Sequence, residues 1–197
     1  MNNFTLTTFL TTNAEIDAQT ANEIISKQKH IDVKKGEFLL MQGDICRHSF
    51  FVEKGLLRYY SIDSKGKEHI LQFAPENWFI ADRESLFYKQ PSQHYIQALE
   101  DSTVVAIDDK FILDLSQNNK TFLENNNRLL HNHIRQLQKR IELLLSATAE
   151  ERYLDFIKVY PDILLRVPQT MVASYLGIMP ESLSRVRREL ANKNFKK

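Results

Sequence analysis

Four polar side chains recur at helical spacing near the C-terminal end of this 197-residue chain. They are Glu181, Ser184, Arg185 and Arg188, which on a helix would form one exposed stripe. In the major groove of DNA, arginine can donate two hydrogen bonds to a guanine edge, and glutamate can accept one from a cytosine amino group. The stripe therefore predicts base reading by a helix, and no catalytic role for these residues.

The residues around the stripe predict two helices joined by a tight turn, within QTMVASYLGIMPESLSRVRREL at positions 169–190. Gly177 fits the left-handed cap that ends the first helix, and Pro180 suits the first turn of the second. Each helix has an apolar side: Val172, Ala173 and Leu176 in the first, and Leu183, Val186 and Leu190 in the second. This arrangement is typical of a helix-turn-helix.

Basic residues are concentrated in the same region. Residues 166–197 hold seven Lys or Arg against two Glu, a net charge of +5, although the whole chain carries only +1. Basic side chains and free N–H groups at helix starts bind phosphate, which adds affinity without reading sequence. The expected phosphate contacts are Gln169, Thr170, Arg187 and Lys193, with Lys196 and Lys197 beyond them. Double-stranded DNA is therefore the expected partner.

A long helix with a heptad repeat precedes this region. Leucine recurs every seven residues at d positions, and the a positions lie four residues beyond the first three: Leu123, Leu130, Leu137 and Leu144 at d, with Asn127, Ile134 and Ile141 at a. Isoleucine at a with leucine at d favours a parallel two-stranded coiled coil, which predicts a homodimer. The alternative is an amphipathic helix that packs on its own domain. The capping box TAEE at Thr148 predicts that a new helix begins there, with a hinge just before it.

The first half of the chain has a different texture. From Val33 to Asp108, short β-prone runs alternate with turns that contain Gly36, Gly43, Gly55 or Gly66, which is typical of an antiparallel sandwich or barrel. No crossover helix separates these runs, so a parallel sheet is not expected. The expected core comprises Phe50, Phe51, Val52, Leu56, Leu57, Tyr59 and Tyr60.

Several classes of site and location are excluded by composition. Cys46 is the only cysteine in these residues, so they hold no internal disulfide, zinc ribbon or cysteine-bound iron–sulfur cluster. No apolar run approaches the length of a membrane span, and the first residues lack the pattern of a secretory signal, so we expect a cytoplasmic location and no membrane partner. The alternative from another class is a β-roll metalloenzyme, but His48, His69 and His94 form no His-x-His pair. We therefore expect no catalytic residue, no metal site and no enzyme activity.

The order of these parts resembles the Crp/Fnr family of bacterial transcription regulators, in the short form found in Bacteroidetes-like bacteria. KKGEFLLMQGD, FFVEKGLLRYY and SYLGIMPESLSRVRREL carry the resemblance most sharply. It implies an α+β fold with an N-terminal antiparallel β-roll of the jelly-roll, cyclic nucleotide-binding-like type, a long dimerisation helix and a C-terminal helix-turn-helix. The expected domains are 1–109, 110–147 and 148–197. Two recognition helices on one dimer predict an inverted-repeat operator. The resemblance also implies RNA polymerase as a further partner and Ser182 as a phosphate contact.

The sequence departs from the family pattern in the effector pocket. Cyclic nucleotide-binding members hold the ribose with a Gly–Glu pair and the phosphate with an Arg–Ser or Arg–Thr pair. Arg83–Glu84 and Ser92–Gln93 stand at these places, so no arginine meets the phosphate and cyclic AMP is not expected to bind in the usual mode. The expected pocket for an unidentified small-molecule effector, with Arg83 or His94 as a possible anion contact, comprises Arg83, Glu84, Ser85, Leu86, Ser92, Gln93 and His94.

A second departure follows the recognition helix. Family members add a β-wing that contacts the DNA backbone, whereas only ANKNFKK follows here. Loss of the wing should reduce affinity more than specificity. A ligand-binding module that acts on a protein partner, without DNA, is the remaining alternative.

Overall fold

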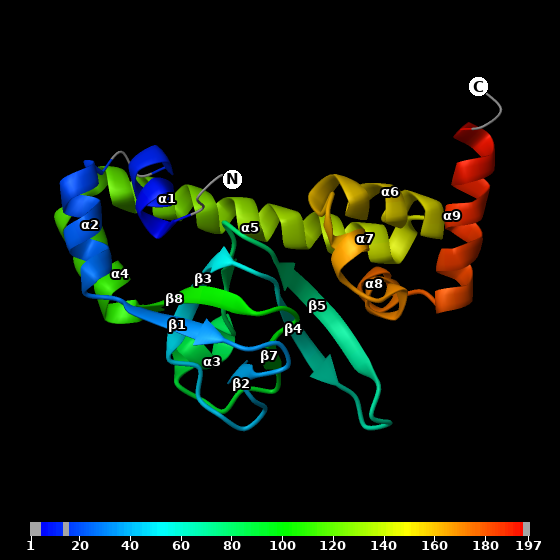
Figure 1. The fold of residues 1–197 in the computed structure, drawn as a ribbon, viewed down its shortest axis with the longest axis horizontal. Coiled ribbons are helices and arrows are strands. Elements are labelled where there is room, and N and C mark those ends of the chain that lie inside the picture. The colour runs from blue at the N-terminus through cyan, green and yellow to red at the C-terminus, as the bar shows by residue number, and fades with distance from the viewer. Residues whose placement is uncertain (1–4, 14–15, 195–197) are drawn as a thin grey trace.

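The structure, a computed structural model, describes residues 5–13 and 16–194. Its parts are a β-roll, a long helix that runs along the roll, and a group of short helices at the far end of that helix (Figure 1). The α+β fold expected from the sequence is confirmed. Within the described residues, no helix is both long enough and apolar enough to cross a bilayer.

The β-roll consists of two four-stranded antiparallel sheets, with strand orders β1-β8-β3-β6 and β2-β7-β4-β5. The strands of the first sheet are β1 (Lys29–Val33), β8 (Ser102–Asp108), β3 (His48–Lys54) and β6 (Phe79–Ile80). Those of the second sheet are β2 (Phe38–Leu40), β7 (Tyr95–Ala98), β4 (Leu57–Ile62) and β5 (Glu68–Ala74). Strand β5 therefore lies at an edge of its sheet, beside the C-terminal helices (Figure 1).

The core of the roll follows the sequence prediction. Six of the seven predicted core residues are buried, and Tyr59 is half-buried against the cluster that contains Phe50, Val52 and Leu57. Between β5 and β4 the register shifts, so that Leu71 has no partner while Ile70 pairs with Tyr60 and Gln72 with Tyr59. Such a β-bulge leaves backbone groups of the bulged residue unpaired by the ladder.

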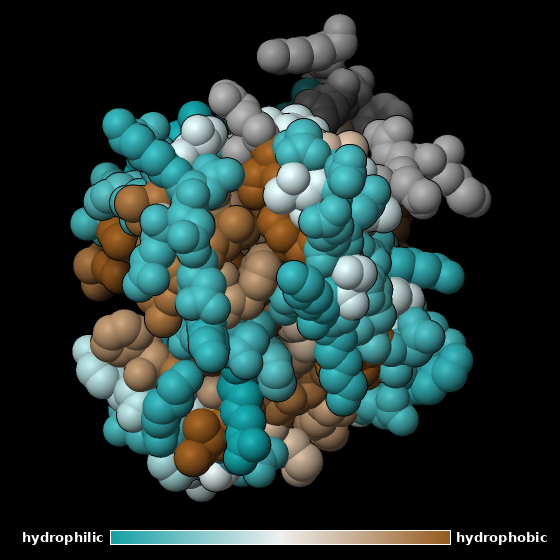
Figure 2. All heavy atoms as spheres, turned by 90° about the vertical axis from the view of Figure 1, so that its left-hand side faces the viewer, coloured by the Kyte–Doolittle hydropathy of each residue, from teal (hydrophilic) through white to brown (hydrophobic). Residues whose placement is uncertain are grey.

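Three helices cover one end of the roll: α1 (Leu6–Asn13), α2 (Ala18–Ser26) and α4 (Asp109–Asn118). Phe9 of α1 packs against Phe51 and Phe79 of the roll in tilted and edge-to-face contacts, with ring centroids 5.4 and 5.1 Å away. The outer surface of this end is largely hydrophilic, with hydrophobic side chains visible in the seams between helices (Figure 2). These helices therefore close the roll with their apolar sides.

The rod helix α5 spans Lys120–Ser146 and begins later than the sequence suggested. The expected helix over 110–147 is divided at Asn119, whose extended backbone separates α4 from α5. The side chain of Asn119 accepts a hydrogen bond from the Phe122 N–H and so caps α5. The heptad positions from Leu123 onward lie on α5, but residues 110–118 belong to a separate helix.

The C-terminal group contains four helices: α6 (Ala149–Val159), α7 (Ile163–Arg166), α8 (Gln169–Leu176) and α9 (Pro180–Asn194). The predicted capping box is present, because the Thr148 hydroxyl accepts from the Glu151 N–H and the Glu151 carboxylate accepts from the Thr148 N–H. Gly177 ends α8 in the left-handed conformation, with φ of 65°. The predicted helix-turn-helix geometry of α8 and α9 is therefore present.

Gly55 provides a test of packing at the roll. Its φ is +93°, and an added Cβ would lie 2.8 Å from the backbone Cα of Ser102 and closer still to that side chain. Gly66 has a similar φ of +77° but open space around it. We therefore expect Gly55→Ala to lower the free energy of unfolding by roughly 1–3 kcal/mol more than Gly66→Ala, because only Gly55 adds a clash to backbone strain. Urea unfolding of both variants measures the difference, and equal losses would contradict the packing.

Candidate nucleic-acid interface and effector cavity

The stripe predicted to read bases is exposed on α9. Glu181, Ser184, Arg185 and Arg188 are all exposed. The opposite side of α9 is buried, with Leu183 fully inside and Val186 5% exposed. The helix is therefore held by its apolar side and presents its polar side to the outside.

Some of these side chains already have partners within the chain. The Ser184 hydroxyl donates to the Pro180 carbonyl at 3.1 Å, which leaves its lone pairs free to accept. The Lys193 ammonium pairs with both carboxylate oxygens of Glu150 at 2.8 and 3.0 Å. The Lys193 side chain is 62% exposed, so this ion pair lies at the surface. A DNA phosphate would have to compete with Glu150 for this lysine.

Of the remaining predicted phosphate contacts, Gln169, Thr170 and Ser182 lie in the first turns of the two helices, and Arg187 lies midway along α9. Gln169 and Thr170 are exposed in the first turn of α8, while Ser182 and Arg187 on α9 are half-buried. Lys196 and Lys197 lie outside the described residues. The free N–H groups at a helix start favour an anion, so Gln169 and Thr170 are placed where a phosphate would be attracted.

The helix-turn-helix is docked on the β-roll by the backbone of strand β5. The Ser174 hydroxyl on α8 accepts a hydrogen bond from the Ile70 N–H at 3.1 Å and donates one to the Glu68 carbonyl at 2.9 Å. Phe73 of β5 lies in one buried cluster with Phe156 and Tyr160 of the C-terminal group. The β-roll and the C-terminal helices thus share a hydrophobic core.

Arg140 of the rod α5 contacts both strand β5 of the roll and helix α8 of the helix-turn-helix. Its guanidinium donates to the Ile70 carbonyl at 3.0 Å, to the Tyr175 carbonyl at 3.1 Å, and also to the Leu71 carbonyl. The guanidinium carbon lies 3.8 Å from the centre of the Tyr175 ring. One side chain therefore connects the rod, the bulge of β5 and the helix-turn-helix.

A second polar link ties α7 to the loops of the roll. The Arg166 guanidinium donates to both carboxylate oxygens of Glu76, at 2.8 and 3.0 Å, and to both of Glu100, at 3.0 and 2.7 Å. Burial alone would raise the pKa of Glu76, but the hydrogen bonds and charge of Arg166 outweigh it and hold that pKa below its ordinary value. Glu76 is therefore an ionised partner of Arg166 at neutral pH, and Glu100 bonds the same guanidinium.

A cavity of about 770 Å³ lies between the roll, the rod and the C-terminal helices. Its walls come from β4, β5, α3 (Arg83–Tyr88), α5, α6 and α8. Aromatic side chains form much of the lining: Tyr59, Trp78, Phe156, Tyr160 and Tyr175. A cavity of this size suits a small organic molecule, and one bound here would touch all three parts of the chain.

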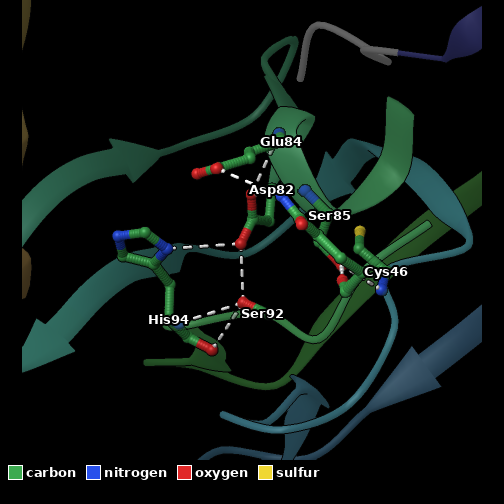
Figure 3. A network of polar contacts seen from close by, with 7 residues as sticks. Cys46, Asp82, Glu84, Ser85, Ser92 and His94 are labelled. Atoms are coloured by element: carbon green, nitrogen blue, oxygen red, sulfur yellow. Dashed lines mark hydrogen bonds and ion pairs between the residues drawn. The ribbon is translucent and has the colours of Figure 1, made fainter. Parts of the chain in front are cut away.

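The polar end of the cavity is organised by Asp82, which sequence reasoning missed. Asp82 is 2% exposed and caps α3, and its carboxylate accepts from the Ser92 hydroxyl at 2.6 Å (Figure 3). The ring Nδ1 of His94 lies 3.2 Å from the same carboxylate. Burial raises the pKa of Asp82, but the bonds from Ser92, the Ser85 N–H and His94 outweigh it and hold that pKa below its ordinary value. Asp82 therefore carries a buried negative charge.

Only part of the predicted effector pocket lines this cavity. Arg83, Glu84 and His94 line it, together with Asp82 and Tyr59, which were not predicted. Ser85 is buried, where its hydroxyl donates to the Gln90 carbonyl and accepts from the Cys46 N–H (Figure 3). The other three predicted residues do not line the cavity: Leu86 is a core residue, Ser92 is buried with its hydroxyl on Asp82, and Gln93 is exposed.

The heptad positions of the rod lie largely on its surface. Ile134, Leu137 and Ile141 are 51%, 45% and 57% exposed, and the neighbouring Leu145 is 82% exposed. Leu123 and Leu144 are each 39% exposed, Asn127 is exposed, and Leu130 is half-buried. Exposed aliphatic side chains in a continuous row mark a protein-binding surface.

Comparison with known proteins bears on all three parts. Residues 30–119 match the family model for the cyclic nucleotide-binding domain. The chain is 28% identical over 183 residues to the transcriptional activator protein anr of Pseudomonas aeruginosa, covering 86% of this chain and 72% of that protein. It is also 28% identical over 183 residues to the fumarate and nitrate reduction regulatory protein of Vibrio cholerae, covering 87% and 72%. Over most of its length the chain is thus similar to named transcription regulators of the Crp/Fnr family.

The fold agrees with this family. A solved structure from Eubacterium rectale, assigned to the Crp/Fnr family as a transcriptional regulator, superposes with a TM-score of 0.64 at 18% identity, covering 91% of this chain and 85% of that one. The relatives are named as regulators, so the prediction of a regulator is supported over the β-roll metalloenzyme. The Crp/Fnr resemblance stated from the sequence is confirmed.

Arg166 should stabilise the docked arrangement far more than an exposed ion pair does. We expect Arg166→Met to lower the free energy of unfolding by about 2 kcal/mol, because it leaves two partly buried carboxylates facing each other. Lys34→Met, which breaks an exposed pair with Asp101, should cost much less, because solvent screens that pair. Urea unfolding at neutral pH compares the two variants.

The pH dependence follows from the lowered pKa of Glu76. A carboxyl whose folded pKa is lowered contributes stability above its ordinary value of 4.5, and that contribution is lost as the pH falls. The difference between the wild type and Arg166→Met should therefore shrink as the pH is lowered below that value. A difference that is constant with pH would contradict the pairing.

Proposed function

We propose that this protein is a homodimeric, sequence-specific DNA-binding transcription regulator of the Crp/Fnr family. The observation that carries the proposal is helix α9, whose apolar side is buried while its Glu, Ser and Arg stripe is exposed. A helix held in this way can enter the major groove and bring Glu181 and Arg185 to base edges. Gln169, Thr170, Ser182, Arg187 and Lys193 are proposed to contact phosphates on either side.

The dimer is proposed to form along the rod. Helix α5 has 27 residues, long enough for the three heptads that begin at Leu123, and its aliphatic side chains are exposed. Two-fold symmetry about the rods gives two copies of α9, so the operator is expected to be an inverted repeat with half-sites about one helical turn apart. RNA polymerase is the proposed further partner, and a DNA partner places the protein in the cytoplasm.

The roll is proposed to sense a small molecule other than cyclic AMP in its usual mode. The hydroxyl of Ser92, expected at the phosphate place, donates to the Asp82 carboxylate and is not free for a ligand. Asp82 also places a negative charge beside Ser92, the residue that the family pattern puts at the phosphate contact, so a cyclic phosphate there would meet repulsion instead of an arginine. The effector is an unidentified small molecule in the cavity that Asp82 borders.

Arg185 tests the base-reading role. Selection of preferred duplexes from a random pool should first yield an inverted-repeat sequence. Arg185→Ala should then weaken binding to that duplex by about 1–3 kcal/mol and relax one base position in each half-site, because a bidentate contact to one base is lost. Fluorescence anisotropy at fixed salt measures the affinity.

Arg47→Ala is the matched control, since it removes the same charge from an exposed arginine of the roll. It should leave both affinity and preference unchanged. Equal effects of the two substitutions would remove Arg185 from base reading. Recovery of no preferred duplex at all would favour the alternative of a module that acts on a protein partner.

Ile141 tests the dimer. Because Ile141 is 57% exposed, Ile141→Glu should leave the fold of each chain intact. It would place two like charges in the proposed interface between the two rods. We expect a shift from dimer to monomer in sedimentation velocity, with loss of operator binding by at least about tenfold. Asn132→Glu adds the same charge on the opposite side of α5 and should stay dimeric. A monomeric wild type would contradict the proposal directly.

A further inference from the structure

Met179 directly precedes Pro180, the first residue of α9, and occupies the N-cap position of that helix. Its carbonyl accepts a hydrogen bond from the Leu183 N–H at 3.1 Å, which closes the first turn. Serine, threonine, aspartate and asparagine are preferred at such a position, because their side-chain oxygen accepts from the free N–H groups of the first turn. The methionine side chain has no oxygen for that bond. The stability of α9 therefore does not explain a methionine here.

The side chain of Met179 is also largely outside the hydrophobic core. It is 60% exposed, although it is apolar. Its neighbour Ile178 packs against the buried cluster that contains Leu176 and Leu183, so another residue supplies the apolar contact of the turn. A single exposed apolar residue is ordinary on a protein surface, but this one also leaves the helix without a side-chain cap. Positions that break a local rule in this way are expected at functional sites.

Met179 lies at the end of α9 that a helix-turn-helix brings to the bases. Helix α9 is on the far side of α8 from the β-roll (Figure 1). In a helix-turn-helix, the N-terminal residues of the recognition helix contact base edges in the major groove. Glu181, the first residue of the stripe, follows Met179 by two positions and is exposed as well. Met179 is thus placed to contact a base pair beside the one that Glu181 reads.

The four residues of the stripe have no group that suits the methyl group of thymine. In the major groove, thymine is distinguished by its O4 acceptor and its C5-methyl group, and the methyl group is recognised by apolar contact. Glu181 offers only acceptors, and Arg185 and Arg188 offer only donors. The Ser184 hydroxyl already donates to a carbonyl in the first turn of its own helix. Met179 is apolar, exposed and flexible enough to adapt its shape to such a contact.

From these observations we infer that Met179 is a specificity-determining residue that contacts the C5-methyl group of a thymine in each half-site of the operator. The inference rests on the proposed function, because it concerns the base contacts of the same helix. Burial of one methyl group against an apolar side chain corresponds to a roughly fourfold gain in affinity. The contact adds a preference for thymine that the polar stripe does not supply.

The test replaces thymine by deoxyuridine, which lacks only the C5-methyl group. Each thymine of the duplex selected from the random pool is replaced in turn, and the affinity of the full chain is measured by fluorescence anisotropy at fixed salt. For the wild type, we expect one position in each half-site at which the replacement weakens binding roughly fourfold. This position is expected beside the base pair at which Glu181 sets the preference.

Three variants assign that effect to a side chain. Met179→Ser should bind the thymine and deoxyuridine duplexes within about 1.5-fold of each other, because the apolar contact is lost. Met179→Leu should keep the wild-type difference, because leucine supplies an apolar group of similar volume. Met41→Ser is the matched control, since it removes another exposed methionine, which lies in the roll and is 48% exposed. It should keep the difference as well.

Thermal unfolding separates a lost DNA contact from a damaged fold. Serine is a preferred N-cap residue, so Met179→Ser should raise the Tm by about 2–4 °C. A loss of thymine preference in a more stable variant cannot come from unfolding. A lower Tm of Met179→Ser would overturn the inference, because it would show that the methionine stabilises the folded chain.

Other outcomes distinguish this inference from the proposed function. The same deoxyuridine effect in the wild type and in Met179→Ser would overturn the inference, and so would an equal loss in Met41→Ser. A selected half-site without thymine, or one in which no replacement changes the affinity, would overturn it too. In each of these cases the duplex is still bound, and the proposed function stands. Recovery of no preferred duplex would refute the proposed function and the inference together.

Discussion

The edge of strand β5 is the constraint on which the arrangement of the three parts depends. An edge strand carries unpaired N–H and C=O groups, and buried backbone groups must find partners. Here Ser174 of α8 satisfies the Ile70 N–H and the Glu68 carbonyl, so a helix replaces the missing neighbouring strand. The bulge at Leu71 adds two more carbonyls, and Arg140 of the rod satisfies both. The position of the helix-turn-helix is thus fixed by the sensor backbone.

The cavity lies beside this same joint, so that a molecule bound there would contact both the roll and the C-terminal helices. Arg140 and Tyr175 belong both to the joint and to the cavity lining. A ligand can shift an equilibrium between two arrangements only by its difference in affinity for them. Because the cavity walls come from the roll, the rod and the C-terminal helices, any movement between these parts alters the ligand's contacts. Binding and helix position are therefore coupled by geometry.

The features that could be predicted from the sequence are those that depend on short spacings along the chain. The capping box at Thr148, the turn at Gly177 and the exposed stripe of α9 follow from spacings of three, four and seven residues, which a helix turns into faces. The pocket was harder to predict, because a shift of one or two positions along the chain decides which carboxylate is buried. Reasoning from a family pattern placed the carboxylate at Glu84, whereas Asp82 is the buried one. The signal available was an Asp directly before a helical run, the ordinary signature of an N-cap.

Contacts between distant segments could not be predicted, because their residues carry no local pattern. Ser174 and Ile70 are separated by 104 positions, and nothing near either one indicates the other. Ser174 lies on an otherwise amphipathic helix, where a lone serine is ordinarily solvated or bonded within the helix. Only the placement of β5 at a sheet edge gives its hydroxyl two backbone groups to satisfy. The most informative polar residues of this protein are therefore those whose partners are backbone groups of another domain.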